Sequence, residues 1–304
     1  MRGALVTRVL AVVADLGVAD ALADGPRPVA DVARETGADE DLLYRMLRAL
    51  ASDGVFAETE HGVFRNTKRS KLLRRNEPYS DLAHLFGGVW YRAVSELDAS
   101  GEPPFPRLFG TDFWSWLAEH PGERAAYDRA MEHGKDHRLD SLAGVAWRGD
   151  ELVVDVGGGN GSLLRGLLER HPGLRGIVFD VPETVRDESV FDDRLAFVPG
   201  SFFESVPTGD VYVLSGILVN WDDEHAEAIL RTIRAAASDD SRLIAVERAV
   251  PPGNEPESAK WLDLLLLAHV GGRERDEAQW RELLGRTGFH LDRIDGDVIE
   301  ASCR

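Results

Sequence analysis

The 304-residue sequence has one cysteine, fewer basic than acidic residues and no long apolar run. Its single cysteine, Cys303, excludes an internal disulfide and a cysteine-ligated metal cluster, so we expect a reducing, cytoplasmic setting. The formal charge of −18 disfavours nucleic acid and anionic membranes as partners, because both select basic surfaces. No apolar run reaches the roughly 18 residues of a membrane-spanning helix. Asp15 and Asp20 interrupt the N-terminal run, which lacks a cleavage pattern and predicts a structural helix.

Residues 1–80 carry a winged-helix pattern. The segment "PVADVARETG" predicts one helix, and the segment from residue 38 predicts a second that Gly54 ends. We assign five apolar residues to the buried face of this second helix: Leu42, Leu43, Met46, Leu47 and Leu50. Two β-prone runs around residues 59–62 then form a small wing. DNA binding is one interpretation, but the acidic chain has only the short basic run "KRSKLLRR", which favours a dimerisation or substrate-covering domain.

Residues 81–147 form a bridge that is rich in aromatic residues. Pro103, Pro104 and Pro106 are expected to break any helix there, and helical spacing resumes afterwards. An aromatic cluster of this kind indicates packing first, although some rings could wall an aromatic substrate pocket. We take Trp90 and Met131 as candidate substrate contacts. The aromatic residues of the bridge are Trp90, Tyr91, Phe105, Phe109, Phe113, Trp114, Trp116 and Tyr127.

Residues 148–304 alternate buried strands with amphipathic helices, which predicts an α/β fold with a doubly wound, mostly parallel, Rossmann-like sheet. Its first strand runs into "VDVGGGNG", where Gly157, Gly159 and Gly161 let the backbone approach a ligand. Asp155 precedes the first glycine by two residues and suits a cationic ligand better than a pyrophosphate. Asp180 ends the second strand, where a carboxylate can accept both hydroxyls of a ribose. Together with "GSFF" at residues 200–203, these features select an adenosine-containing cofactor.

These motifs, with "FDVPETV", "NWDDEHAEAIL" and "DLLLLAHVGGRERDEAQWRELLGRTGF", resemble class I S-adenosylmethionine-dependent O-methyltransferases. The resemblance is closest to the plant caffeate-type and actinobacterial aromatic polyketide enzymes. It implies that Asp155 and the three glycines line the methionine side of the cofactor and that Asp180 holds the ribose. It also places Ser201, Phe202 and Ser215 beside the adenine and the cofactor's edge, with Ser201 replacing a common aspartate. A homodimer through an N-terminal winged-helix dimerisation domain is implied as well.

The catalytic base of the plant-type enzymes is missing. Their motif reads "HDW", and its histidine deprotonates the substrate hydroxyl between two glutamates. By resemblance Val219 replaces that histidine and Asn220 the aspartate after it, while Glu247 and Glu274 match the two glutamates. Valine cannot accept a proton, so the plant mechanism does not carry over. We expect Asn220, Glu247 and Glu274 to orient the substrate by hydrogen bonds.

Three interpretations of Val219 remain open. Methyl transfer could proceed by alignment alone, since orientation contributes roughly 7–11 kcal/mol and a base only about 10²–10⁴-fold. Another group could act as the base, with His133, His137 and His269 as candidates; His269 is preferred because the matching segment lines the substrate pocket in the family. The protein could also bind the cofactor without transferring methyl, as its anthracycline hydroxylase and decarboxylase relatives do.

The leading hypothesis is an S-adenosylmethionine-dependent methyltransferase that acts on a hydroxyl of an aromatic or polyketide secondary metabolite. The alternatives are a non-methylating enzyme with the same cofactor, an N- or C-methyltransferase, and a winged-helix regulator that senses a small molecule. We expect no nucleic-acid or membrane partner and no metal, because neither His-x-His nor clustered carboxylates occur at the strand tips.

Overall fold

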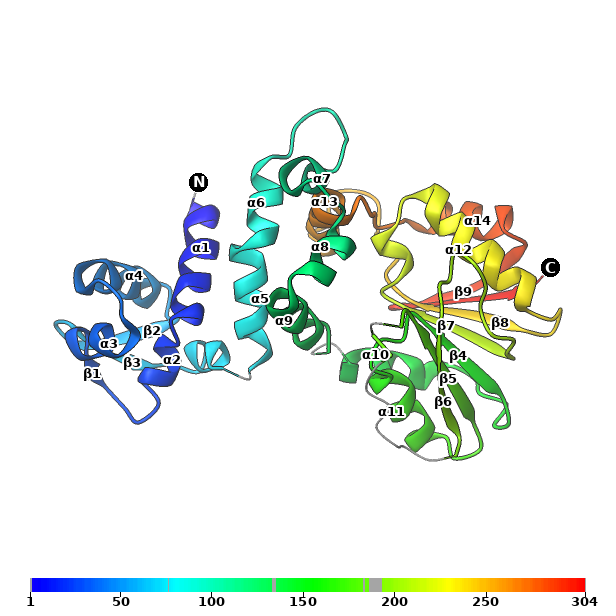
Figure 1. Cartoon of the computed structure of the whole chain (residues 1–304), viewed down its shortest axis with the longest axis horizontal. Helices are drawn as coiled ribbons and strands as arrows, with labels where there is room; N and C mark the ends of the chain where they lie inside the picture. The colour runs from blue at the N-terminus through cyan, green and yellow to red at the C-terminus, as the bar shows by residue number, and fades with distance from the viewer. Residues whose placement is uncertain (1, 76, 133–134, 183, 186–192, 304) are drawn as a thin grey trace. The chain divides into compact units, whose positions relative to one another are not determined.

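A computed structural model describes residues 2–75, 77–132, 135–182, 184–185 and 193–303 of the chain (Figure 1). The chain divides into two compact units, Met1–His133 and Gly134–Arg304, and each is described by itself. Within the described residues, no helix is both long enough and apolar enough to cross a membrane.

The first unit begins with a three-stranded sheet flanked by helices, in the strand order β1-β3-β2. The elements of this winged helix are α1 (Arg2–Asp15), α2 (Val18–Ala21), β1 (Arg27–Pro28), α3 (Val29–Thr36), α4 (Glu40–Ser52), β2 (Phe56–Glu60), β3 (Val63–Asn66) and the 3₁₀ helix η1 (Ser70–Leu73). The predicted helices and wing are confirmed. Gly54, at φ +71°, follows α4 in the left-handed conformation that glycine adopts without strain.

The prediction that Leu42 lies on the buried face of α4 is wrong. Leu43, Leu47 and Leu50 are buried, whereas Leu42 is 51% exposed. Asp39 caps α4 by accepting the Leu42 backbone N–H at 2.8 Å. In this first turn Leu42 lies about 100° around the helix from its buried neighbour Leu43.

The remaining helices of the first unit are α5 (Pro78–Gly87), α6 (Val89–Ser95), α7 (Pro104–Phe109), α8 (Phe113–Glu119) and α9 (Pro121–Glu132). The expectation that the prolines break any helix there was wrong. Pro103 is instead the N-cap of α7 and Pro104 its first residue, a position where the missing N–H has no helical partner to lose. Phe105 is fully buried and stacks on Phe109 with ring centroids 4.4 Å apart. The aromatic residues of the bridge thus pack on one another.

A histidine joins three helices of the first unit. His84 of α5 lies 2.8 Å from Asp15 of α1 through Nδ1 and 3.0 Å from Glu123 of α9 through Nε2. Facing a carboxylate with each ring nitrogen, it donates from both and is therefore protonated. The hydrogen bonds to Asp15 and then Glu123 raise the pKa of His84 to about 10.

The second unit contains a seven-stranded sheet in the order β6-β5-β4-β7-β8-β10-β9. Its strands are β4 (Leu152–Val156), β5 (Arg175–Asp180), β6 (Leu195–Pro199), β7 (Val211–Ser215), β8 (Arg242–Val246), β9 (Phe289–Asp295) and β10 (Val298–Cys303). Strands β4 to β8 pair in parallel, and β10 pairs antiparallel with both β8 and β9. The predicted doubly wound, mostly parallel sheet is confirmed.

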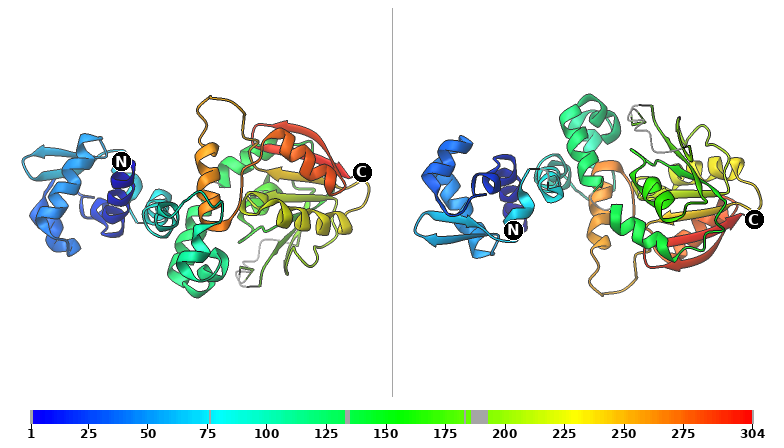
Figure 2. Two further views of the ribbon diagram at one scale, coloured as in Figure 1. Left: turned by 90° about the horizontal axis from the view of Figure 1, so that it is seen from above. Right: turned by 90° about the horizontal axis from the view of Figure 1, so that it is seen from below.

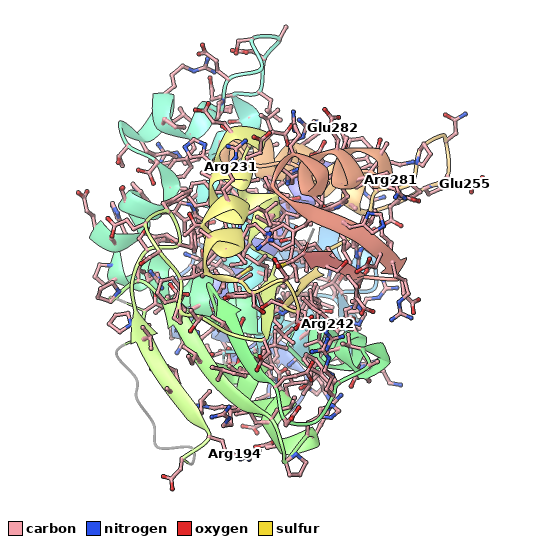
Figure 3. All side chains as sticks on the ribbon, turned by 90° about the vertical axis from the view of Figure 1, so that its right-hand side faces the viewer. Arg194, Arg231, Arg242, Glu255, Arg281 and Glu282 are labelled. Carbon is pink, nitrogen blue, oxygen red and sulfur yellow. The ribbon has the colours of Figure 1, made fainter. Side chains whose placement is uncertain are left out.

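Helices cover both faces of this sheet (Figures 1 and 2). The helices of this unit are α10 (Lys135–Ser141), η2 (Leu142–Gly144), α11 (Ser162–Arg170), η3 (Leu218–Asn220), α12 (Asp223–Ala236), α13 (Ala259–Val270) and α14 (Glu277–Arg286). Of these, α12 and α14 pack on one face of the sheet and α10 and α11 on the other. Successive strand residues point to opposite faces, so Val154 packs with α12 and α14 while Val153 packs with α10 and α11. Charged residues lie on the outer surface of the α12 and α14 helices, with Arg231 on α12 and Arg281 and Glu282 on α14 (Figure 3).

Candidate active site

The strand order reverses between β4 and β7, the first strand of the sheet and its neighbour on the other side. Open α/β sheets bind ligands in the crevice outside the carboxyl ends of the strands at such a point. Two buried polar atoms there, Asp155 Oδ2 on β4 and Ser215 Oγ on β7, have no hydrogen-bond partner among the described residues. Buried polar atoms are nearly always paired in proteins, so these two indicate that a polar ligand belongs at this position.

The turn after β4 is fixed by hydrogen bonds to the end of β5. Gly157 donates its backbone N–H to Phe179 O at 2.7 Å, and Gly159 donates to Asp180 Oδ2 at 2.8 Å. Gly157, Gly159 and Gly161 have φ angles of +74°, +59° and +74°. A Cβ on Gly157 would collide with the Ile217 side chain, whereas a Cβ on Gly159 would meet no protein atom within 4 Å. Gly159 therefore borders open space.

Asp155 is almost fully buried in β4, at 2% exposure. Burial, and then the charge of Asp180, raise the pKa of its carboxyl group to about 7. A cation bound beside Oδ2 would replace part of the lost hydration and restore the charged form. This arrangement fits a ligand that brings a positively charged group to the turn.

Asp180 ends β5 with both carboxyl oxygens engaged locally. Oδ2 accepts the Gly159 N–H, and Oδ1 accepts the Val181 N–H at 2.7 Å. Each carboxylate oxygen can accept further hydrogen bonds, so this group can hold the turn and still receive the two hydroxyls of a ribose.

An aromatic edge follows β6. Phe202 lies against the glycine turn, where one atom of its ring is 3.8 Å from a Cβ built on Gly157. It also meets Phe203 edge to face at 4.9 Å, and Phe203 in turn meets Trp221 at 4.9 Å. Ser201 Oγ accepts the Phe203 N–H at 3.3 Å. These rings form an apolar aromatic cluster beside the turn, against which a nucleobase can pack.

Val219 lies in η3, a short turn directly after β7 that Glu247 holds in place. Glu247 Oε1 accepts the backbone N–H groups of Ile217 at 2.8 Å and Leu218 at 2.7 Å. Its Oε2 is buried without a partner in the part of the chain that the structure describes, and burial raises the pKa of Glu247 to about 7. Asn220 Nδ2 donates to Gly216 O at 2.8 Å. Two of the sequence-predicted substrate groups thus shape the turn itself.

A fully buried arginine completes this turn, and sequence reasoning missed it. Arg275 donates to Leu218 O at 2.9 Å and to Trp221 O at 3.0 Å, and pairs with Asp223 of α12 at 3.0 Å. It thereby binds carbonyl groups at the beginning and at the end of η3. Its only signal in the sequence is its position next to Glu274.

Glu274 is the second matching glutamate, at 8% exposure. Its backbone N–H donates to Asp263 Oδ1 of α13 at 2.7 Å, and its Oε2 is buried without a hydrogen bond to any described residue. Burial, and then the charge of Asp263, raise the pKa of Glu274 to about 7.

The histidine candidates differ in their surroundings. His269 of α13 is buried, and its Nδ1 contacts the carbonyl oxygen of Leu265, which requires the proton to be on Nδ1. Burial lowers the pKa of His269 to about 4, so it is neutral at pH 7. His137 binds Asp297 at 2.7 Å on the surface. His133 is outside the described residues.

Trp90 and Met131 belong to the first unit, on α6 and α9. Trp90 is buried at 4% exposure and meets Phe86 edge to face at 4.9 Å. Their proposed contact with substrate stays a prediction.

The strand order, the acidic glycine turn, the carboxylate at the end of β5 and the unpartnered polar atoms together define a Rossmann-like methyltransferase that uses S-adenosylmethionine. The fit to this cofactor is carried by Asp155 Oδ2, which can receive the amino group of the methionine portion, and by the open space beside Gly159.

Comparison with known proteins identifies the family. The chain matches the model of the O-methyltransferase domain over residues 91–290 and that of the O-methyltransferase dimerisation domain over residues 1–76, and it belongs to this family. Phenazine O-methyltransferase from Lysobacter antibioticus is 38% identical over 96% of this chain and 89% of that protein.

Two solved structures show the same architecture. The mitomycin 7-O-methyltransferase has a TM-score of 0.92 at 33% identity, over 100% of this chain and 95% of that one. An O-methyltransferase from neocarzinostatin biosynthesis, solved with S-adenosyl-L-homocysteine and 1,4-dihydroxy-2-naphthoic acid, has a TM-score of 0.86 at 30% identity, over 98% and 96%.

Proposed function

We propose that this methyltransferase transfers a methyl group from S-adenosylmethionine to a hydroxyl of an aromatic secondary metabolite. The observation that carries the proposal is the buried, unpartnered carboxylate oxygen of Asp155 beside a glycine turn at the switch point of the sheet. The relatives support the acceptor, since the neocarzinostatin enzyme was solved with a dihydroxynaphthoic acid. When bound, the cofactor supplies a methyl group on a positively charged sulfur.

The cofactor would be held by residues of β4, β5, β6 and β7. We assign the amino group of its methionine portion to Asp155, its ribose to Asp180, its adenine to Ser201 and Phe202, and its edge to Ser215. Because Gly157, Gly159 and Gly161 have no side chains, the cofactor could approach the backbone of the turn closely. The support is the placement of all these residues at the carboxyl edge of one sheet.

The acceptor would be oriented by groups around η3. Glu247 and Asn220 position the turn through their hydrogen bonds to residues 216–218, and Val219 presents an apolar surface to the acceptor. Glu274 and His269 would face the acceptor from the α13 side. Alignment of the acceptor is then the main contribution of the protein to the rate.

The enzyme would act as a homodimer in the cytoplasm. The dimerisation domain matched over residues 1–76 supports the dimer. Leu5 and Leu42, at 67% and 51% exposure, leave apolar surface on this domain for a partner to cover. The single cysteine supports a reducing setting. Light scattering after size exclusion would show about twice the chain mass of 33.5 kDa, and a single chain mass at micromolar concentration would contradict the dimer.

Mass spectrometry of the products tests the proposed reaction. Purified protein would be incubated with S-adenosylmethionine and a panel of phenols, hydroxyquinones and carboxylated polyketides, with and without oxygen. Gain of one methyl group with release of S-adenosylhomocysteine is the expected result. Gain of oxygen or loss of carbon dioxide, with the cofactor unconsumed, would instead identify a non-methylating enzyme.

A further inference from the structure

The segment that carries Glu274 packs directly on the turn that carries Val219. Arg273 donates its backbone N–H to Val219 O at 2.9 Å. A Cβ on Gly272 would collide with the same carbonyl oxygen, so only glycine permits this approach. The turn follows β7, at the edge of the sheet where ligands bind. Residues 272–274 therefore border the position where the plant-type enzymes carry their histidine.

The carboxyl group of Glu274 has no hydrogen bond to any described residue, although more than nine-tenths of its surface is buried. A carboxylate in this state is costly, because burial removes its water and no N–H replaces it. The cost is removed when a hydroxyl of a ligand donates to Oε2. The carboxyl group of Glu274 can thus accept a hydrogen bond from a ligand hydroxyl.

Glu247 differs from Glu274 in this respect. Its Oε1 accepts two backbone N–H groups that hold η3, so its first task is to position the turn. Glu274 accepts no such backbone hydrogen bond within the described structure, and its buried Oε2 is left for a ligand.

The charges around Glu274 balance one another. Asp263 of α13 and Asp297 of the β9–β10 hairpin raise its pKa, whereas Arg248 after β8 and the neighbouring Arg275 lower it. Glu247 at the end of β8 is coupled to it as well. Burial outweighs the arginines, and the resulting pKa of about 7 is suited to a group that takes a proton near neutral pH.

We propose that Glu274 accepts the proton of the acceptor hydroxyl, the task that Val219 cannot perform. The inference rests on the proposed O-methyl transfer. The O–H bond of the acceptor breaks, its proton goes to Glu274 Oε2, and its electron pair forms the new O–CH₃ bond. The S–CH₃ bond of the donor breaks, and the sulfur keeps that electron pair as a neutral thioether. Glu274 then returns the proton to water.

The test compares Glu274→Gln with Glu282→Gln, an exposed glutamate on α14 (Figure 3). Two acceptors of similar shape are used, one weakly acidic and one already ionised at pH 7. With S-adenosylmethionine saturating at every pH, we expect kcat/KM of the wild type for the weakly acidic acceptor to rise with pH through about 7. Glu274→Gln should lose this rise and about 10²–10⁴-fold in rate, while turnover of the ionised acceptor falls less than about threefold, because it needs no base. Glu282→Gln should match the wild type.

A second readout does not depend on turnover. The absorbance of a chromophoric phenol, bound with S-adenosylhomocysteine, reports its ionisation across pH, and this titration should shift in Glu274→Gln. Glu274→Asp, which keeps the carboxyl group, should retain the pH dependence at a lower rate.

Equal losses on both acceptors, or an unchanged pH profile in Glu274→Gln, would overturn the inference. If the wild type methylates no acceptor, the proposed function itself fails.

Discussion

Gly159 donates its backbone N–H to Asp180 Oδ2 at 2.8 Å, which ties the turn after β4 to the end of β5. Asp180→Ala removes this bond together with the carboxylate that would receive the ribose. We expect binding of S-adenosylhomocysteine, measured by calorimetry, to weaken tenfold or more, because a hydrogen bond to a charged group contributes roughly 1.5–3 kcal/mol. Asp210→Ala removes a carboxylate that accepts the Leu152 N–H at the opposite end of β4. Unchanged affinity in Asp180→Ala would show that the ribose binds elsewhere.

Two glycines of the turn should respond differently to alanine. Gly157→Ala would strain a left-handed residue and push its Cβ into Ile217. Because such overpacking costs about 1–3 kcal/mol of folding stability, the midpoint of thermal unfolding should fall by several degrees. In Gly159→Ala the new Cβ would meet no protein atom, so only the backbone strain remains. This variant should lose less stability than Gly157→Ala, but it should bind the cofactor more weakly, because the methyl group would occupy the space beside the turn. Equal thermal shifts in the two variants would argue against this division.

Cofactor binding should depend on the ionisation of Asp155. Burial raises the pKa of this carboxyl group to about 7 in the unliganded protein, and a cation beside it lowers the pKa on binding. Binding of S-adenosylhomocysteine, whose amino group is positively charged at neutral pH, therefore releases protons, and affinity falls as pH drops through about 7. Calorimetry in two buffers of different ionisation enthalpy measures this release. Asp155→Asn should bind more weakly and release none; proton release equal to the wild type would assign it to another group.

Val219→His restores the side chain of the plant-type base. We expect this variant to keep activity, and in a Glu274→Gln background to restore turnover of weakly acidic phenols, since a positioned base contributes about 10²–10⁴-fold. Val219→Leu is the matched control, because it changes the volume without adding a base. Complete loss of turnover in Val219→His, with normal circular dichroism and cofactor binding, would show that the valine shapes the pocket.

His84 should stabilise the first unit in a pH-dependent manner. Its pKa is raised from 6.5 to about 10 by Asp15 and Glu123. Its contribution is therefore complete below pH 6.5 and disappears as pH rises through about 10. His84→Gln should lower the free energy of unfolding by about 1–2 kcal/mol at pH 7, allowing for solvent screening. Urea unfolding at pH 7, 8.5 and 10 measures the difference, which should shrink at the highest pH; a constant difference would indicate lost packing instead.

Much of the fold was predictable because its signals are local. Alternating apolar strands, amphipathic helices and a glycine turn each depend on neighbouring residues, and Gly54 and Gly157 adopt the positive φ angles that their positions indicated. Asp180 was found because it stands where a strand ends. The exposure of Leu42 was missed, since packing against the other elements of the first unit decides which side of α4 is covered.

The interior of the candidate site was less predictable because long-range contacts define it. Glu247 accepts N–H groups of residues 30 and 29 positions away, and Arg275 donates to the carbonyl groups of Leu218 and Trp221. No local pattern separates an arginine on the surface from one that crosses the core. The sequence could therefore identify Glu247 and Glu274 as members of the site, but only the fold distinguishes the glutamate that holds a turn from the one whose carboxyl group is unpartnered.

The position of β10 between β8 and β9 has a consequence for the assembly of the sheet. Until the β9–β10 hairpin docks, β8 presents a row of unpaired backbone N–H and C=O groups along one side. An exposed strand edge of this kind can pair with another chain. Strands β9 and β10 pair with each other as a hairpin, and β10 then pairs with the exposed side of β8. In the folded sheet β10 covers this edge, so β8 cannot recruit a strand from another chain.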